Sequence, residues 1–267
     1  MSEVQQYLES LTKKGEKALV PFTVAGYPSV DESVRLGLDI LEAGGDVLEL
    51  GLPYSDPMAD GPVIETASHQ AVNNGVRTKD VLKIVEGIKK KTSKPLVLLS
   101  YYNPILKYGL RPFIQDFVNA GLSGLVIPDL PLEEREEIYS EVKGRLSLIP
   151  LISPVTGEGR LGVILKRSDG FVYCISRQGT TGARDTLSQQ GEELIERASR
   201  HTNLPLLLGF GISTPEQAQL AAKYASGVIV GSAVVKKITD NPKEVPHFVS
   251  ELKDGLRPQS PPAVQET

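Results

Sequence analysis

The chain has 267 residues, 40% of them hydrophobic, and is long enough to bury a substantial core in one domain. Its 29 Lys and Arg residues against 33 Asp and Glu residues give a net charge of −4, which excludes a general basic field for nucleic acid or anionic lipid. A single cysteine, Cys174, excludes an internal disulfide. Residues 1–20 are polar and amphipathic, without a signal or membrane-spanning segment, so we expect a cytoplasmic protein.

Short apolar runs alternate along the chain with stretches of helical periodicity. The candidate strands are 18–25, 46–52, 96–102, 124–130, 146–154, 171–177, 205–211 and 227–235, and candidate helices between them include 31–43, 78–91, 110–120, 133–145, 189–200 and 214–223. This alternation predicts a parallel sheet covered by helices. Eight units predict a closed (β/α)₈ TIM barrel, with an open doubly wound sheet as the alternative.

The predicted domain boundaries follow from composition. Residues 1–255 form the barrel with an N-terminal helix, and the Pro-, Ser- and Gln-rich residues 256–267 form a disordered tail. About fifty residues separate the starts of the second and third strands, and the loop PYSDPMADGP accounts for much of the excess. In a barrel such a loop follows the carboxyl end of its strand, where active sites of this architecture lie.

A glutamate interrupts the second apolar run. Because side chains alternate along a strand, Leu48 and Leu50 face the helices and Glu49 points into the barrel near its carboxyl rim. Partial desolvation there would raise its pKa and allow proton exchange near neutral pH. The alternative is a structural glutamate hydrogen-bonded within the barrel. Asp56 and Asp60 follow on the loop, each as plausible a turn former as a catalytic group, and their spacing does not choose between them.

Glycine-containing turns follow the last three predicted strands, at 176–185, 208–213 and 230–235. Glycine lets backbone N–H groups approach an anion closely, and the turns after strands seven and eight often bind phosphate in barrels. Gly211, Gly231 and Ser232 are the natural donors, although glycine between a strand and a helix is also a common structural choice.

The usual groups for carbon–carbon cleavage are missing. From residue 46 onward no predicted strand carries a lysine for a Schiff base, and His69, His201 and His247 are scattered, which predicts no metal site. Proton transfer by carboxylates on a phosphorylated substrate is the chemistry that remains.

The stretch LELGLPYSDPMADGP, with PFTVAGYP before it and SRQGTTG, LGFGIS and VGSAVV after it, resembles the tryptophan synthase alpha subunit over nearly the whole chain. The resemblance implies a (β/α)₈ barrel that cleaves indole-3-glycerol phosphate to indole and glyceraldehyde 3-phosphate. It also implies an alpha2-beta2 heterotetramer in which indole passes to a beta subunit. Pyridoxal phosphate is expected in that partner, and no cofactor is expected in this chain.

The resemblance also implies roles for two carboxylates. Glu49 matches the family's general acid/base at the indole C3 carbon and the glycerol hydroxyl, and Asp60 matches the group that hydrogen-bonds the indole N–H. Protonation of C3 turns the ring into its own electron sink, which fits the missing lysine and metal.

Other implied positions surround the substrate or contact the partner. Those implied to bind substrate are Phe22, Tyr173, Thr181, Gly182, Phe210, Gly211, Gly231 and Ser232, with Thr181 closing over Asp60. Those implied to lie at the partner interface are Pro53, Asp56 and Pro57. The sequence departs from the family in RQGTT, where many members have a valine before the second threonine, and at Pro128, where some have a small residue.

Two other functions stay open. A related phosphate-binding barrel, such as indole-glycerol-phosphate synthase or phosphoribosylanthranilate isomerase, is one, and the missing strand lysine argues against the former. A non-catalytic subunit that activates a partner is the other, against which an intact Glu49 and Asp60 argue.

Overall fold

The computed structural model describes residues 2–175, 184–209 and 211–257, with 184–188 described by their backbone alone. The strands are β1 (Ala18–Val24), β2 (Leu48–Gly51), β3 (Leu96–Leu99), β4 (Gly124–Val126), β5 (Ser147–Ile149), β6 (Leu151–Ile152), β7 (Val172–Ile175), β8 (Leu206–Gly209) and β9 (Gly227–Val230). All pair in parallel, in the order β5-β4-β3-β2-β1-β9-β8-β7-β6.

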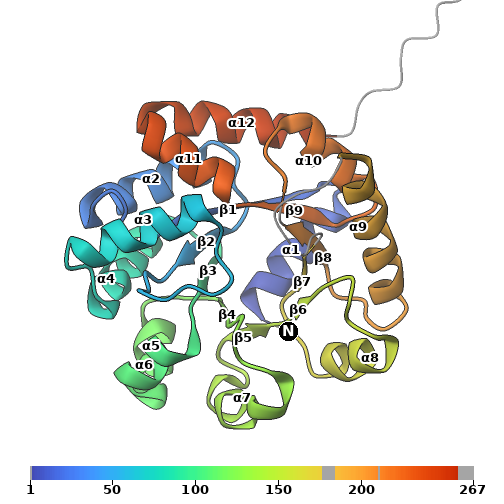
Figure 1. The fold of residues 1–267 in the computed structure, drawn as a ribbon, viewed down its shortest axis with the longest axis horizontal. Helices are drawn as coiled ribbons and strands as arrows, with labels where there is room; N and C mark the ends of the chain where they lie inside the picture. The colour runs from blue at the N-terminus through green and yellow to red at the C-terminus, as the bar shows by residue number, and fades with distance from the viewer. Residues whose placement is uncertain (1, 176–183, 210, 258–267) are drawn as a thin grey trace, which may run out of the picture.

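Helices surround the strands (Figure 1). They are α1 (Glu3–Lys13), α2 (Val30–Glu42), α3 (Pro62–Asn73), α4 (Thr78–Lys89), α5 (Tyr102–Tyr108), α6 (Leu110–Asn119), α7 (Glu136–Val142), α8 (Glu158–Lys166), α9 (Arg184–Ser199), α10 (Pro215–Ala222), α11 (Ser232–Asp240) and α12 (Val245–Gly255), with 3₁₀ turns η1 (Leu132–Glu134) and η2 (Pro242–Glu244). Among the described residues, no helix is both long and apolar enough to cross a membrane.

The sheet curls into a nearly closed barrel, which confirms the predicted fold class over the open-sheet alternative. The predicted fifth strand is divided at Pro150, because proline has no N–H to donate to a ladder. Its first half, β5, pairs with β4, and its second half, β6, pairs with β7. In the described part of the chain, nine strand segments therefore occupy the eight strand positions that the sequence predicts.

Several predicted elements are wrong at their ends. The run 227–235 is not one strand, because β9 ends at Val230 and α11 begins at Ser232. Val234, Val235 and Ile238 are buried at helical spacing, so this β-branched run belongs partly to a helix. The predicted helix 133–145 is a 3₁₀ turn followed by the short helix α7.

Some helices were not predicted. The long interval after β2 holds α3 as well as the loop, and Pro62 occupies the first turn of that helix. Helices α5, α8 and α12 also fall outside the predicted set. Leu256, the first residue of the predicted tail, is buried at the end of α12. The predicted disorder of the rest of the tail stays a prediction, since 258–267 lie outside the described residues.

The barrel interior is filled by apolar side chains and closed at the amino ends of the strands by α1. The strand residues of this cluster include Val20, Val97, Val126, Ile149, Leu207 and Ile229, and Val47, directly before β2, joins them. On α1, Val4, Leu8 and Leu11 share one face and join the same cluster. In Figure 1, α1 accordingly appears inside the ring of strands.

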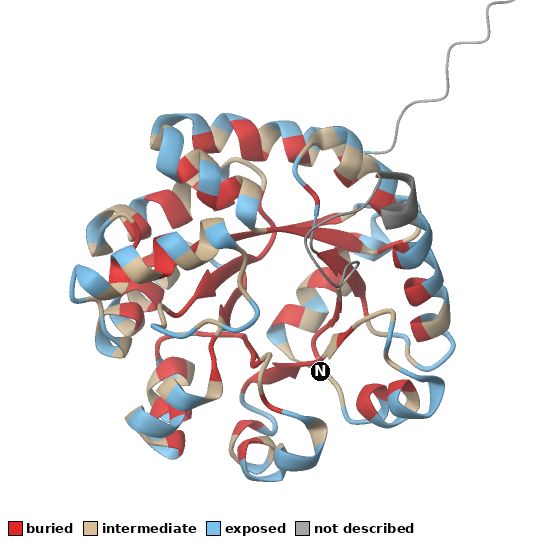
Figure 2. Ribbon diagram, viewed as in Figure 1, coloured by how far each residue is buried: buried red, intermediate tan, exposed pale blue. Residues whose placement is uncertain are grey.

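A larger cluster lies between the strands and the outer helices. Figure 2 shows buried residues along the strands and on the inward faces of the helices, with exposed residues outside. An ion pair between Asp46 and Lys253 joins the amino end of β2 to α12. Asp46 Oδ2 accepts hydrogen bonds from Lys253 Nζ at 2.7 Å and from the Leu19 N–H at 2.7 Å, and Lys253 Nζ also donates to the Lys17 carbonyl at 3.0 Å. This ion pair joins the last helix to the barrel.

Candidate active site

Glu49 lies on β2 with its side chain inside the barrel. It pairs in register with Phe22 of β1 and Val97 of β3, and only 1% of its surface is exposed. Leu48 and Leu50 belong to the outer cluster that the helices cover, as strand alternation requires. The placement is the one predicted from the sequence.

The carboxyl group of Glu49 has no hydrogen-bond partner in the described part of the chain, at either oxygen. Burial raises its pKa from 4.5 to about 8, and the nearby charge of Asp60 acts in the same direction. At neutral pH the group therefore holds its proton. A buried, protonated carboxyl group without a hydrogen-bond partner can donate its proton to a bound substrate.

Asp60 lies on the loop after β2 and is partly buried. Burial raises its pKa from 3.8 to about 6, although the hydrogen bond from the Tyr101 side chain opposes the rise. The Tyr101 hydroxyl also accepts a hydrogen bond from the Ala59 N–H at 2.8 Å. Asp60 is therefore ionised at neutral pH while Glu49 is protonated, so the two carboxyl groups have different protonation states.

Tyr101 fixes this part of the loop. The sequence does not predict this role, because an aromatic residue at the end of a strand is most often part of the core. It is buried just beyond β3, with its ring 5.4 Å from that of Tyr54. The Tyr54 N–H donates to Ser68 Oγ on α3 at 2.9 Å, and Asn103 Nδ2 on α5 donates to the Tyr54 hydroxyl at 3.1 Å. Helices on either side of the loop thus hold it over the barrel.

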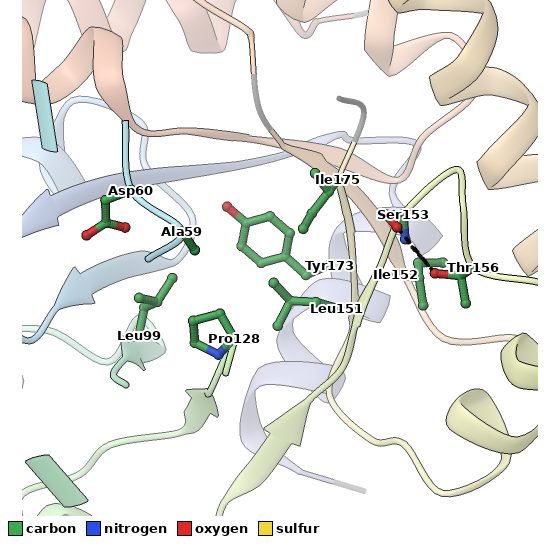
Figure 3. Close-up of a pocket in the computed structure, with 10 residues that line it drawn as sticks. All are labelled: Ala59, Asp60, Leu99, Pro128, Leu151, Ile152, Ser153, Thr156, Tyr173 and Ile175. Atoms are coloured by element: carbon green, nitrogen blue, oxygen red, sulfur yellow. Dashed lines mark hydrogen bonds between the residues drawn. The ribbon is translucent and has the colours of Figure 1, made fainter. Parts of the chain in front are cut away.

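A cavity of about 220 Å³ lies beside Asp60 at the carboxyl ends of the strands, and Glu49 is not among the residues that line it. Its lining residues are Ala59, Asp60, Leu99, Pro128, Leu151, Ile152, Ser153, Thr156, Tyr173 and Ile175 (Figure 3). Most of them are apolar. Tyr173 is 6% exposed, and its pKa is raised by burial and by the charges of Glu49 and Asp60, which places its ring near both carboxyl groups. Of the lining residues, Tyr173 and Asp60 were predicted as site residues, and Pro128 is the position where some family members have a small residue.

Gly211 and Gly231, two of the glycines predicted to bind phosphate, follow β8 and β9 and so lie at the same end of the barrel. β8 and β9 are parallel neighbours, so the turns that follow them are adjacent. Gly211 has φ of +86°, a left-handed conformation that glycine adopts without strain. Gly231 precedes Ser232, the first residue of α11, and a Cβ on Gly231 would lie 3.6 Å from the Phe22 ring. Because Phe22 is in register with Glu49, this helix N-terminus lies close to the buried carboxyl group.

Three predicted substrate residues, Thr181, Gly182 and Phe210, lie outside the described residues, and their roles stay predictions. The predicted partner residues lie on the loop after β2. Asp56 is exposed and accepts a hydrogen bond from Ser55 Oγ at 2.5 Å, and Pro53 and Pro57 are partly buried beside it. Across the described ranges, no three His, Cys, Asp or Glu side chains gather closely enough to hold a metal ion.

A nearly closed ring of parallel strands, with two carboxyl groups and a cavity at their carboxyl ends, defines the class: the chain is an enzyme of the (β/α)₈-barrel type. A family model described as tryptophan synthase alpha chain matches residues 8–258. The chain belongs to the tryptophan synthase alpha chain family and is thus a lyase subunit of tryptophan biosynthesis. The resemblance drawn from the LELGLPYSDPMADGP stretch is confirmed.

Relatives and solved structures agree. The tryptophan synthase alpha chain of a Thermoanaerobacter species is 44% identical over 263 residues, which cover 96% of this chain and 100% of that one. A structure of Mycobacterium tuberculosis tryptophan synthase matches with a TM-score of 0.91 at 37% identity, covering 97% of this chain and 99% of that one. The alpha subunit from Legionella pneumophila matches with a TM-score of 0.88 at 34% identity, covering 96% and 98% of the two chains.

Proposed function

We propose that this chain cleaves indole-3-glycerol phosphate to indole and glyceraldehyde 3-phosphate, with Glu49 as general acid and base and Asp60 as the partner of the indole N–H. The observation that carries the proposal is the pairing of a buried, unpartnered carboxyl group, whose pKa is about 8, with a second carboxyl group whose pKa is about 6. At a pH between these two values, Glu49 is protonated and can donate its proton, and Asp60 is ionised.

The chemistry follows from the two protonation states. Protonated Glu49 gives its proton to C3 of the indole ring, and the positive charge that develops at the ring nitrogen is stabilised by ionised Asp60, which accepts the N–H hydrogen bond. The Glu49 carboxylate then takes the proton of the neighbouring glycerol hydroxyl as the carbon–carbon bond breaks and the bonding electrons return to the ring. The proton lent to C3 is replaced from the hydroxyl, so Glu49 ends the cycle as it began.

The lining of the cavity supports this assignment. Apolar side chains such as Leu99, Leu151 and Tyr173 offer a dry surface for a flat bicyclic ring. For the phosphate we assign the backbone N–H groups around Gly211 and Gly231 and the hydroxyl of Ser232. The first turn of a helix leaves N–H groups without intrahelical acceptors, and the helix dipole favours an anion there.

We also propose that the exposed loop bearing Pro53, Asp56 and Pro57 contacts a beta subunit in an alpha2-beta2 assembly. Family membership implies a beta-subunit partner, and one solved relative is described as the aminoacrylate-bound form of tryptophan synthase. Met58 on the same loop is 79% exposed, which fits a surface that a partner covers. In this proposal pyridoxal phosphate belongs to that partner, this chain needs no cofactor, and the complex works in the cytoplasm. Adding a beta subunit should then accelerate indole formation.

The test is indole release from indole-3-glycerol phosphate by the full-length chain and two isosteric variants, Glu49→Gln and Asp60→Asn. Each variant should lose turnover by at least about a hundredfold, because each loses a group that acts in the transition state. Glu193→Gln, an exposed change on α9, is the matched control and should leave turnover intact. Normal turnover in both site variants would refute the assigned roles. No indole from the unaltered chain, with or without a beta subunit, would favour a non-catalytic activator.

A further inference from the structure

One guanidinium group joins α9 to the turn that follows β6. Arg197 Nη1 donates to the Pro154 carbonyl at 3.1 Å, and Nη2 donates to the Thr156 carbonyl. Its Nε donates to Glu158 Oε1, the first residue of α8, at 2.6 Å. Only 26% of the Arg197 side chain is exposed, so these bonds are partly shielded from water. A single side chain thus holds three acceptors spread over residues 154–158.

The turn held in this way forms one wall of the cavity. Ser153 and Thr156 both line it, and they lie in Figure 3 at the opposite end of the lining from Asp60. The Ser153 N–H donates to Thr156 Oγ1 at 3.1 Å, and the Thr156 N–H donates to the Ser153 carbonyl at 2.9 Å. Between them Val155 is 68% exposed, so its side chain does little to hold the turn in place. The position of this wall therefore depends on the hydrogen bonds at its carbonyl groups.

Glu158 keeps the guanidinium group in place. Its second oxygen, Oε2, lies 2.9 Å from His201 Nε2, and the hydrogen bonds from Arg197 and then His201 lower the pKa of Glu158. The planar guanidinium group can serve the carboxylate and both carbonyl groups at once, because its N–H groups point in fixed directions. A lysine could reach fewer acceptors with less exact geometry.

We propose that Arg197 is a positioning residue that fixes the far wall of the indole pocket and so sets the affinity for the ring and the selectivity for its size. The inference rests on the proposed function, since it takes this cavity as the indole site. Without Arg197 the carbonyl groups of the turn bond to water and the turn samples more conformations, so substrate binding must first order it. The proton transfers at Glu49, on another strand, keep their geometry.

The experiment compares Arg197→Met and Arg197→Lys with Arg200→Met in the full-length chain. Arg200 directly follows the last residue of α9, is exposed, and pairs with Glu196 four residues earlier. It is therefore an arginine of the same segment that makes an ion pair but does not contact the turn. The measurements are KM and kcat for indole-3-glycerol phosphate, the Kd for 3-(indol-3-yl)propyl phosphate, which lacks the hydroxyl needed for cleavage, and the melting temperature. The relative kcat/KM for a ring-substituted substrate, 5-methylindole-3-glycerol phosphate, reports selectivity.

Arg197→Met should raise KM and the analogue Kd about tenfold, because two or more charge-assisted hydrogen bonds are lost, while kcat stays within about twofold. In Arg197→Met, discrimination against the 5-methyl substrate should also fall. Arg197→Lys should recover part of the affinity. Arg200→Met should match the unaltered chain in every measurement. A lower melting temperature with unchanged KM, Kd and selectivity would mean a structural role and overturn the inference alone. If Arg197→Met does not fold, an unchanged KM in Arg197→Lys overturns it instead. An unaltered chain that neither cleaves the substrate nor binds the analogue overturns the proposed function and this inference together.

Discussion

Replacing Glu49 by glutamine should make the protein more stable as it makes the enzyme inactive. The carboxyl pKa is about 8 in the folded protein and 4.5 ordinarily. Below pH 4.5 both the folded and the unfolded chain hold the proton. As pH rises towards 8 only the folded chain holds it, so the free energy of unfolding falls by about 1.4 kcal/mol per pH unit. That amounts to about 3 kcal/mol at pH 7 and about 5 kcal/mol above pH 8.

Glutamine has nearly the same shape and never ionises, so the variant escapes this loss. Urea unfolding of both proteins between pH 4.5 and pH 8, followed by circular dichroism, measures the free energies. The difference in favour of Glu49→Gln should grow by about 3 kcal/mol between pH 4.5 and pH 7. Glu193→Gln, on the solvent side of α9, should show no such growth. A difference that stays constant across this range would contradict the buried, proton-holding carboxyl group on which the mechanism depends.

Three further predictions concern the site and the base of the barrel. The value of kcat/KM should rise with pH as Asp60 loses its proton near pH 6 and fall as Glu49 loses its proton near pH 8. The rise near pH 6, the lower limb of the profile, should be absent in the remaining activity of Asp60→Asn. Tyr101→Phe removes a hydrogen bond that lowers the pKa of Asp60. The lower limb of the profile should therefore move up by about one pH unit, and turnover should fall about tenfold. A lower limb at the same pH would contradict the contact between Tyr101 and Asp60. Asp46→Asn leaves Lys253 partly buried without its counter-charge, so urea unfolding should show a loss of about 3 kcal/mol with kcat unchanged, and a negligible loss would contradict the anchoring role of the pair.

The sequence predicts the barrel well because its strands are short runs buried on both faces. Hydrophobic periodicity fails to assign an element where the same apolar run is compatible with both a strand and a helix. Val234 and Val235 extend the apolar run of β9 and yet belong to α11, since β-branched residues occur in both elements. The division of the fifth strand also has a local cause, Pro150, but whether a proline ends a strand or divides it depends on the neighbours with which each half pairs.

Some of the candidate site residues could be predicted from the sequence. Alternation along β2 is enough to turn Glu49 inward, because its period is fixed by backbone geometry. The resemblance to a known family, not spacing, singled out Asp60 over Asp56. Tyr101 and Arg197 were not found, since each acts through contacts with segments distant in the chain, and neither an aromatic at a strand end nor an arginine on a helix is unusual. Such contacts appear only when the fold brings the segments together.

The break at Pro150 separates the strands into two crescents, β1 to β5 and β6 to β9, which are hydrogen-bonded to each other through the β1–β9 ladder and joined in the chain where Pro150 links β5 to β6. Glu49 and the loop bearing Asp60 belong to one crescent, and Leu151 of the opposite wall belongs to the other. Among the described strands no ladder joins β5 to β6, so the positions of these groups relative to each other depend on the Pro150 linkage and on the β1–β9 ladder. The two sides of the cavity are thus held by different groups of strands, and its width is set by how those groups are joined.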